Sequence, residues 1–196
     1  MPTQKQRSDA TRELLVDAFR QSLLNKGLDA TTTAGVLAET GLSKGALYHH
    51  FSSKNEIVEA IYRADSHGAI RRSLSSVPAD CSPIERLKRG CENWLKEMRK
   101  RETGRIVLEL GPQALGLERV IAIESELSLR LFGHILEEAV QAGELEPSDT
   151  RLAARLINAL MTELAIARPS SQRDPISLVA PLIDGILSGL AVTASD

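Results

Sequence analysis

Residues 32–51 read TTAGVLAETGLSKGALYHHF and decide how the chain folds. Apolar residues at three- and four-residue spacing predict two short helices, the first beginning at Thr32 or Thr33 and the second capped by Ser43. Between them, Gly41 supplies the positive φ that a tight turn between crossing helices requires. The apolar residues that can face inward and hold this crossing are Val36, Leu42, Leu47 and Phe51. The layout is typical of a helix-turn-helix, although two short helices around a glycine also occur in many helical bundles.

Helical periodicity extends along almost the entire chain, and no run of alternating β-branched residues predicts a strand. We therefore expect an all-α fold of about nine helices. The expected helices span residues 8–25, 32–40, 43–51, 53–75, 82–101, 105–110, 117–142, 149–167 and 174–192. Glycines follow three of these helices at Gly27, Gly41 and Gly143, and Gly111-Pro112 ends the helix at 105–110.

Capping residues mark several helix starts. Ser8 or Asp9 caps the first helix, and the segments Ser53-Lys54-Asn55-Glu56 and Ser82-Pro83-Ile84-Glu85 have the form of capping boxes. The stretch SLSSVPADCS, residues 73–82, lacks helical periodicity and contains a proline. It is the best candidate for a hinge between an amino-terminal helix-turn-helix unit and a larger carboxy-terminal helical body.

Charge is distributed unevenly along the chain, although the formal net charge of its 196 residues is only −2. Residues 1–54 contain seven of the 24 Lys and Arg residues and five of the 26 Asp and Glu residues. The rest of the chain therefore has 17 basic and 21 acidic residues. Phosphate neutralisation by Lys and Arg is the main sequence-independent source of affinity for nucleic acid. The amino-terminal part thus has the net positive charge that DNA binding requires.

Several other classes of protein are excluded by what the sequence lacks. No apolar run approaches the roughly 18 residues that a bilayer span needs, and the polar start lacks a secretory apolar stretch, so we expect a cytoplasmic protein without membrane association. Cys81 and Cys91 are expected to be reduced thiols, and no metal-ligand set is apparent. No catalytic triad, paired-carboxylate motif or phosphate-binding loop occurs, and His67 and His134 have no identifiable partners. We therefore expect no catalytic residues, no metal and no cofactor.

Three segments give the chain a more specific resemblance. They are Gly27-Leu28-Asp29-Ala30-Thr31-Thr32, then Gly41-Leu42-Ser43-Lys44-Gly45-Ala46-Leu47-Tyr48-His49-His50-Phe51, then Ser53-Lys54. Together they closely resemble the signature of TetR-family transcriptional regulators over roughly the first sixty residues. The resemblance implies a three-helix DNA-binding domain at residues 1–53 with a polar arm at 1–7, a connecting helix at 54–75, and a helical effector-binding and dimerisation domain at 76–196.

The resemblance assigns contacts with base edges to residues on or just before the second helix of the motif. They are Ser43, Lys44, Gly45, Ala46 and His49. Lys44 can donate to guanine O6 and N7, and His49 can donate or accept, whereas Gly45 and Ala46 permit close approach or contact a thymine methyl group. Because few of these side chains form hydrogen bonds, we expect DNA shape to contribute to recognition.

Contacts with phosphates are assigned in the same way to four residues of the motif and to a lysine just after it. They are Thr32, Thr33, Tyr48, His50 and Lys54. Such contacts position a protein on DNA without reading its sequence. The arm contains Lys5 and Arg7, which can reach an adjacent groove or backbone, but a disordered tail is an equal alternative. His49 and His50 also allow a solvated helix end or part of a metal site, although no carboxylate or cysteine lies at ligand spacing in that helix.

The last two helices have apolar stripes that exceed what one chain needs to bury. The resemblance implies that they pair with their copies in a second subunit as a four-helix bundle, the alternative being an intrachain core. The expected interface residues are Leu152, Leu156, Ala159, Leu160 and Leu164 on one helix and Val179, Leu182, Ile183, Ile186 and Leu190 on the other. A two-fold dimer presents paired recognition helices about one DNA turn apart and therefore predicts a palindromic operator.

The helices between residues 82 and 142 surround an effector pocket if the resemblance extends to them. The expected lining residues are Cys91, Trp94, Met98, Leu108, Ile123, Leu127, Phe132 and Ile135, with Glu124, His134, Asn158 and Thr162 as scattered polar groups. An apolar stripe at helical spacing also fits an ordinary core. The expected ligand is an unidentified, mainly apolar metabolite that is neutral or weakly anionic.

The resulting hypothesis is a homodimeric repressor that leaves its palindromic operator when a small molecule binds and moves the helix after Ser53. The alternative is a DNA-binding regulator controlled by a protein partner, or an architectural protein without a small-molecule effector. A helical enzyme is the remaining class, and the missing catalytic motifs argue against it.

Overall fold

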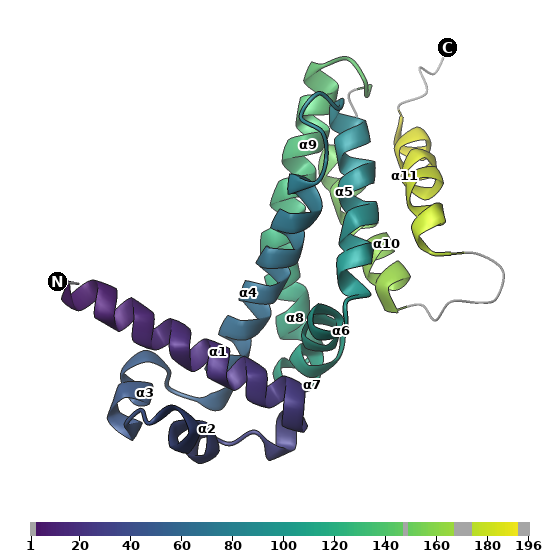
Figure 1. Ribbon diagram of the computed structural model, residues 1–196. Helices are drawn as coiled ribbons and strands as arrows, with labels where there is room; N and C mark the ends of the chain where they lie inside the picture. The colour runs from purple at the N-terminus through teal and green to yellow at the C-terminus, as the bar shows by residue number, and fades with distance from the viewer. Residues whose placement is uncertain (1–2, 147–148, 167–173, 192–196) are drawn as a thin grey trace, which may run out of the picture. The chain divides into compact units, whose positions relative to one another are not determined.

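The computed structural model describes residues 3–146, 149–166 and 174–191 and contains only helices within them (Figure 1). The helices are α1 (Gln4–Ala30), α2 (Thr33–Thr40), α3 (Lys44–His50), α4 (Lys54–Ser75), α5 (Pro83–Met98), α6 (Arg101–Gly104), the π-helical η1 (Arg105–Leu110), α7 (Gly111–Leu115), α8 (Leu117–Glu124), the π-helical η2 (Ser125–Leu129), α9 (Arg130–Gln141), α10 (Thr150–Ile166) and α11 (Ile176–Leu190). Segments α6, η1 and α7 are contiguous, as are α8, η2 and α9. Counted as continuous stretches, the described helices number nine, which confirms the predicted class.

The chain divides into two compact units. The first comprises Met1–Ser66 together with Gly104–Val120, and the second comprises His67–Thr103 together with Ile121–Asp196. The grouping of residues 104–120 with the amino-terminal helices has no counterpart in the domain boundaries expected from the sequence. Helix α4 begins in the first unit and ends in the second, so the boundary falls within a continuous helix.

The core of the first unit joins α1, α2, α3, the first half of α4 and η1. Its buried members are Leu15, Phe19, Leu23, Val36, Leu47, Phe51, Ile57, Val58, Ile61, Ile106 and Leu110. Three of the four residues expected to hold the helix crossing are therefore fully buried, and Leu42 packs against them while partly exposed. Helices α2 and α3 both contact α1, which confirms the helix-turn-helix arrangement (Figure 1).

Helix α1 begins earlier than the sequence indicates. Thr3 caps it, since its hydroxyl accepts from the Gln6 N–H while the Gln6 side chain accepts from the Thr3 N–H, a complete capping box. Ser8 and Asp9, the two expected caps, both lie within the helix. The expectation of a non-helical segment before Ser8 was therefore wrong for residues 4–7, because the Thr3–Gln6 box satisfies amides that a later start leaves without partners.

The turn of the motif forms as the sequence predicts. Gly41 has φ of 69°, and its N–H bonds to the Leu37 carbonyl at 2.9 Å. Thr32 accepts from the Gly35 N–H at 3.1 Å and Ser43 accepts from the Ala46 N–H at 3.1 Å, so each motif helix has the expected cap. Both helix starts and the turn between them are thus determined by local hydrogen bonds.

Two helices expected from periodicity differ from those observed. The helix at 105–110 does not end at Gly111-Pro112 but continues through α7 to Gly116, where φ is 80°. The helix at 117–142 contains the π-helical segment η2 near its middle. Because a π-helical turn shifts the hydrogen-bond register by one residue, apolar periodicity does not reveal it. Gly143, with φ of 72°, ends the second stretch as expected.

The core of the second unit is formed by α5, α9, α10 and α11, with α5 in contact with the other three. Its buried residues are Leu87, Cys91, Leu95, Ile135, Leu136, Ala153, Ala154, Ile157, Met161, Val179, Ile183 and Leu187. Helix α4 continues three residues into the expected hinge and leaves 76–82 as the connection to α5, which Ser82 caps. Among the described residues, no helix is both long and apolar enough to cross a bilayer.

Candidate nucleic-acid interface

Helix α3 presents most of the expected base-contacting residues to solvent. Ser43, Lys44, Gly45 and His49 are exposed, and Ala46 is half-buried. The opposite side of the helix is held by Leu47, which is fully buried in the core of the first unit. One face of this short helix is therefore buried, and the other presents polar side chains and small residues that a ligand can contact.

Lys44 and Tyr48 lie together on the exposed side of α3. The Lys44 Nζ is 5.7 Å from the centre of the Tyr48 ring, and Tyr48 is 50% exposed. An ammonium group over an aromatic face is attracted electrostatically, so the contact orients a flexible lysine. The Tyr48 hydroxyl and the Lys44 ammonium group are therefore presented from one surface.

His49 and His50 lie beside one another, with ring centres 5.0 Å apart in an edge-on arrangement. His49 is exposed and His50 is half-buried. In the described part of the chain, no three or more His, Cys, Asp or Glu side chains are arranged to hold a metal ion.

Two of the expected phosphate-contacting residues outside α3, Thr32 and Lys54, have structural partners of their own. Thr32 is exposed and caps α2, and Thr33 is half-buried. The Lys54 ammonium group donates to the Leu28 carbonyl at 2.5 Å, which joins the start of α4 to the end of α1. Since an ammonium group has three N–H donors, this bond leaves two for another acceptor.

The start of α4 differs in detail from the expected capping box. Ser53 accepts from the Glu56 N–H at 3.2 Å, as predicted. The Glu56 carboxylate, however, accepts from the N–H and hydroxyl of Ser52, at 2.7 and 2.6 Å, rather than from Ser53. These hydrogen bonds from Ser52 lower the pKa of Glu56 below its ordinary value.

Residues 104–120 brace helices α1 and α4 within the first unit. Gly27 has φ of 81° and ψ of 179°, which interrupts the helical ladder of α1, and the Arg105 guanidinium group donates to the Leu24 carbonyl in the turn before it. Arg119 forms a bidentate pair with Glu59 on α4, at 2.8 and 2.6 Å. Hydrogen bonds from Arg119, and then from Arg63, hold the pKa of Glu59 below its ordinary value against the effect of its burial. No motif in the sequence indicated these contacts.

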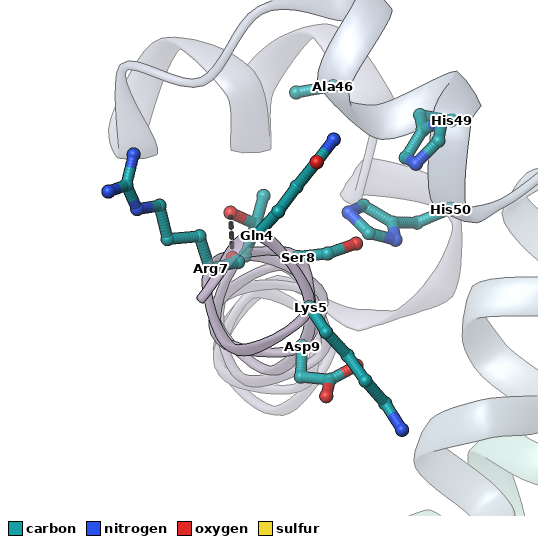
Figure 2. A pocket seen from close by; sticks show the side chains of 9 residues that line it. Gln4, Lys5, Arg7, Ser8, Asp9, Ala46, His49 and His50 are labelled. Atoms are coloured by element: carbon teal, nitrogen blue, oxygen red, sulfur yellow. Dashed lines mark hydrogen bonds between the residues drawn. The ribbon is translucent and has the colours of Figure 1, made fainter. Parts of the chain in front are cut away.

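An open groove of about 650 Å³ lies between the first turns of α1 and helix α3 (Figure 2). Its lining residues are Gln4, Lys5, Arg7, Ser8, Asp9, Thr11, Ala46, His49 and His50. The structure therefore places Lys5 and Arg7 in the lining of one groove with three residues of the helix that is expected to read DNA, and the Lys5 side chain is directed away from that helix (Figure 2).

The expected effector-pocket residues divide between interior and surface. Cys91, Met98, Ile123 and Ile135 are buried, and Trp94, Glu124, Leu127, Phe132 and Asn158 are half-buried, all within the second unit. Leu108 belongs to the first unit, Thr162 is exposed, and the His134 side chain is 70% exposed near Glu138. The exposed side chains of His134 and Thr162 are therefore not gathered with the interior residues. Burial raises the pKa of the Cys91 thiol to about 12.

Two polar features inside the second unit were missed from the sequence. The Ser128 and Asn158 side chains are hydrogen bonded at 2.6 Å between η2 and α10. Glu97 is buried and pairs with Arg72, at 2.7 Å, and with Lys100. Although burial by itself raises the pKa of Glu97, hydrogen bonds from Lys100 and Arg72 leave it below its ordinary value. Neither pair has a local sequence signal, because Ser128 and Arg72 are distant in sequence from their partners.

The residues expected at a dimer interface differ in their exposure. Val179 and Ile183 have no exposed surface because they pack in the core of the single chain. In contrast, Leu152, Leu156 and Leu182 are 39%, 40% and 41% exposed. Ala159 is exposed, and Leu160, Leu164, Ile186 and Leu190 are half-buried. The face open to a partner is therefore narrower than the two predicted stripes.

Comparison with known protein families gives two matches that together span most of the chain. Residues 84–190 match the family described as "Tetracyclin repressor-like, C-terminal domain", and residues 15–61 match "Bacterial regulatory proteins, tetR family". The first match alone covers more than half of the chain.

Individual relatives are more distant. The transcriptional repressor KstR2 of Mycobacterium tuberculosis is 31% identical over 80 residues, which span 41% of this chain and 40% of KstR2. The transcriptional regulator TtgR of Pseudomonas putida is 28% identical over 74 residues, or 37% of this chain and 35% of TtgR. The chain thus aligns with well under half the length of these relatives.

Solved structures share the fold over nearly the full length. A TetR-family regulator from Pectobacterium atrosepticum matches with a TM-score of 0.72 and 22% identity, covering 98% of this chain and 99% of that one. RolR, solved with resorcinol, matches with a TM-score of 0.67 and 17% identity over 97% and 92% of the two chains. With both domain families matched in order, the chain belongs to the TetR family of bacterial regulatory proteins.

Proposed function

We propose that this protein is a homodimeric transcriptional repressor that acts in the cytoplasm, binds a palindromic operator through α3 and releases it when a small molecule binds. One observation carries the DNA-binding part of the proposal. Ser43, Lys44, Gly45 and His49 form an exposed surface on a helix whose other face is anchored by Leu47. An α-helix presented in this way fits the major groove, where Lys44 can donate to guanine.

The dimer is supported by the apolar surface on α10 and α11. Leu152, Leu156 and Leu182 are each about 40% exposed, and Gly185 and Gly189 on α11 have no atom near enough to contact an added β-carbon. Small residues beside exposed leucines permit close packing of helices from two subunits. A two-fold dimer then presents two copies of α3 to two half-sites, which requires a palindromic operator.

The small-molecule part of the proposal rests on the interior of the second unit. The apolar residues Cys91, Trp94, Phe132 and Ile135 belong to or pack on its core, and Asn158 provides a polar group at its edge with Ser128. RolR, which shares the fold, was solved with resorcinol, a small aromatic compound. We propose a mainly apolar effector, neutral or weakly anionic, and no catalytic role for the site.

The proposed release acts through α4, which runs continuously from Lys54 beside the motif to Ser75 in the second unit. An effector that binds more tightly when the carboxy-terminal half of α4 is displaced stabilises that conformation, and α3 then moves away from its half-site. Converting a 1:99 population ratio to 99:1 requires about 5.5 kcal/mol of differential affinity.

The direct test is selection of bound duplexes from a random DNA pool, followed by footprinting of the enriched sequence. We expect a palindrome protected on two half-sites. The same selection is repeated with protein that has been denatured, stripped of bound small molecules and refolded. Absence of enrichment in both preparations at low salt contradicts the proposal, whereas enrichment only after stripping identifies a copurified inducer.

A further inference from the structure

The α1 side of the groove between α1 and α3 is lined by residues that the family signature in this sequence does not include. We propose that it holds the sugar–phosphate backbone of one DNA strand beside the major groove, so that the first two turns of α1 form a second contact surface for DNA. This inference rests on the proposed DNA-binding function and deepens it, since it assigns DNA contacts to Gln4, Lys5, Arg7 and Ser8.

The first argument is position. Ala46, His49 and His50 form one wall of the groove, and they lie on the helix whose exposed surface is expected to contact DNA. Figure 2 shows the Gln4 side chain directed toward Ala46 and the Ser8 side chain directed toward His50. A DNA strand that reaches His49 from the α1 side therefore meets Gln4 and Ser8 as well.

The second argument is the chemistry of the lining. Lys5 and Arg7 are cations, Gln4 and Ser8 are neutral hydrogen-bond donors, and these are the side-chain types that contact phosphate oxygens in DNA complexes. Thr11 is not assigned to DNA, because its hydroxyl donates within α1 to the Arg7 carbonyl at 2.9 Å. Asp9 is the one acidic residue of the lining, and Figure 2 shows its side chain and that of Lys5 directed away from α3. The lining thus has a net positive charge and favours an anion.

The third argument is that α1 places these groups on a regular helix. The Thr3–Gln6 capping box begins α1 before Lys5, so the four contact residues have helical positions rather than those of an extended arm. Helical order before binding reduces the conformational entropy that a flexible arm loses when it orders on DNA. A helical segment also suits the backbone beside the major groove better than insertion into the narrow minor groove.

The test compares operator and random duplexes over a range of salt concentrations, with three double variants of the full-length protein. Lys5→Ala/Arg7→Ala removes the two cations, and Gln4→Ala/Ser8→Ala removes the two neutral donors. Lys96→Ala/Arg101→Ala removes two exposed cations from the second unit and is the charge-matched control. Circular dichroism and thermal unfolding establish that each variant is folded.

We expect Lys5→Ala/Arg7→Ala to weaken binding to operator and random DNA by similar factors, roughly tenfold to a hundredfold at 0.1 M salt, and to make the salt slope shallower by about two. Gln4→Ala/Ser8→Ala is expected to abolish interference by ethylation of one flanking phosphate while leaving the salt slope nearly unchanged. The charge-matched control keeps the slope and affinity of the wild type.

A salt slope equal to that of the wild type in folded Lys5→Ala/Arg7→Ala overturns the inference, as does an equal loss in the charge-matched control. A change of base preference at one operator position for Gln4→Ala/Ser8→Ala overturns the assignment to phosphate. In each case the wild-type protein still binds its operator, so the proposed function stands. Failure of the wild type to select any duplex contradicts the proposed function itself.

Discussion

A β-carbon at Gly111 would lie 2.2 Å from Cδ2 of Tyr62 and 2.9 Å from the Ile106 carbonyl oxygen. Tyr62 is buried on α4, and Gly111 begins α7 in the segment that packs against the DNA-binding helices. The absence of a side chain at Gly111 therefore permits the close approach of α4 and α7 within the first unit.

Gly111→Ala is expected to lower the free energy of unfolding by about 1–3 kcal/mol, because the Tyr62 ring must move to admit the methyl group. Chemical denaturation measures the change. Gly133→Ala is the matched control, since Gly133 lies within α9 and its β-carbon would contact nothing within 4 Å. Alanine there is expected to stabilise the protein by up to about 1 kcal/mol through helix propensity. Equal effects at both positions would contradict the packing argument.

Lys44→Ala is expected to weaken binding to the operator by about 1–3 kcal/mol if Lys44 donates to a guanine edge. Binding to random DNA should change less, because a base contact contributes only to the specific complex. Fluorescence anisotropy with operator and scrambled duplexes measures both affinities. Equal loss on the two duplexes would assign Lys44 to the phosphate backbone.

Lys54→Ala is expected to alter both DNA binding and stability. Loss of a phosphate contact weakens binding to all sequences and reduces the salt slope by about one. Loss of the bond to the Leu28 carbonyl lowers the free energy of unfolding by about 1 kcal/mol. Lys26→Ala removes an exposed α1 lysine that pairs with Glu39 at 2.5 Å, and it provides the comparison. If Lys54→Ala and Lys26→Ala lower stability by similar small amounts and neither changes the salt slope of DNA binding, Lys54 has only a structural role.

Leu156→Asp and Leu182→Asp are expected to dissociate the proposed dimer, because each places a charge on the exposed apolar face of α10 and α11. Sedimentation across a range of protein concentrations measures the change of mass, and operator affinity should fall with it. Leu117→Asp is the control, since Leu117 is 70% exposed on α8. A monomeric wild-type protein, or dimers that persist in both variants, would refute this interface.

Cys91 is expected to resist thiol reagents in the folded protein, whereas Cys81 is only partly buried. Burial raises the pKa of the Cys91 thiol from an ordinary value of 9.0 to about 12, so the folded state retains a proton that the unfolded state releases. The stability contributed by this thiol is therefore present below pH 9 and decreases as the pH rises from about 9 to 12.

Mass spectrometry after alkylation at pH 8 should show one modified cysteine in the folded protein and two after denaturation. Cys91→Ala should reduce the loss of stability between pH 9 and pH 11, as measured by denaturation at each pH. Rapid alkylation of Cys91 in the folded state would contradict the burial of its side chain.

The local sequence determined the helix-turn-helix motif and several of the helix starts. Thr32, Gly41, Ser43 and Ser82 act through hydrogen bonds or backbone torsions within a few residues, so their roles as caps and turn are apparent from residue type and spacing. The TetR signature around Gly41 lies in the same short segment. The positions of these caps and of this turn therefore depend mainly on neighbouring residues and little on tertiary contacts.

Tertiary structure decided which surfaces meet. Periodicity places Val179 and Leu182 on the same apolar helix, but only packing against α5 and α10 buries the first and leaves the second 41% exposed. The grouping of residues 104–120 with the first unit depends on contacts such as Arg105 with Leu24, across 81 positions of sequence. The groove between α1 and α3 likewise joins Gln4 to Ala46. Such long-range contacts have no local signal, because they depend on the shape of both partners after each helix has formed.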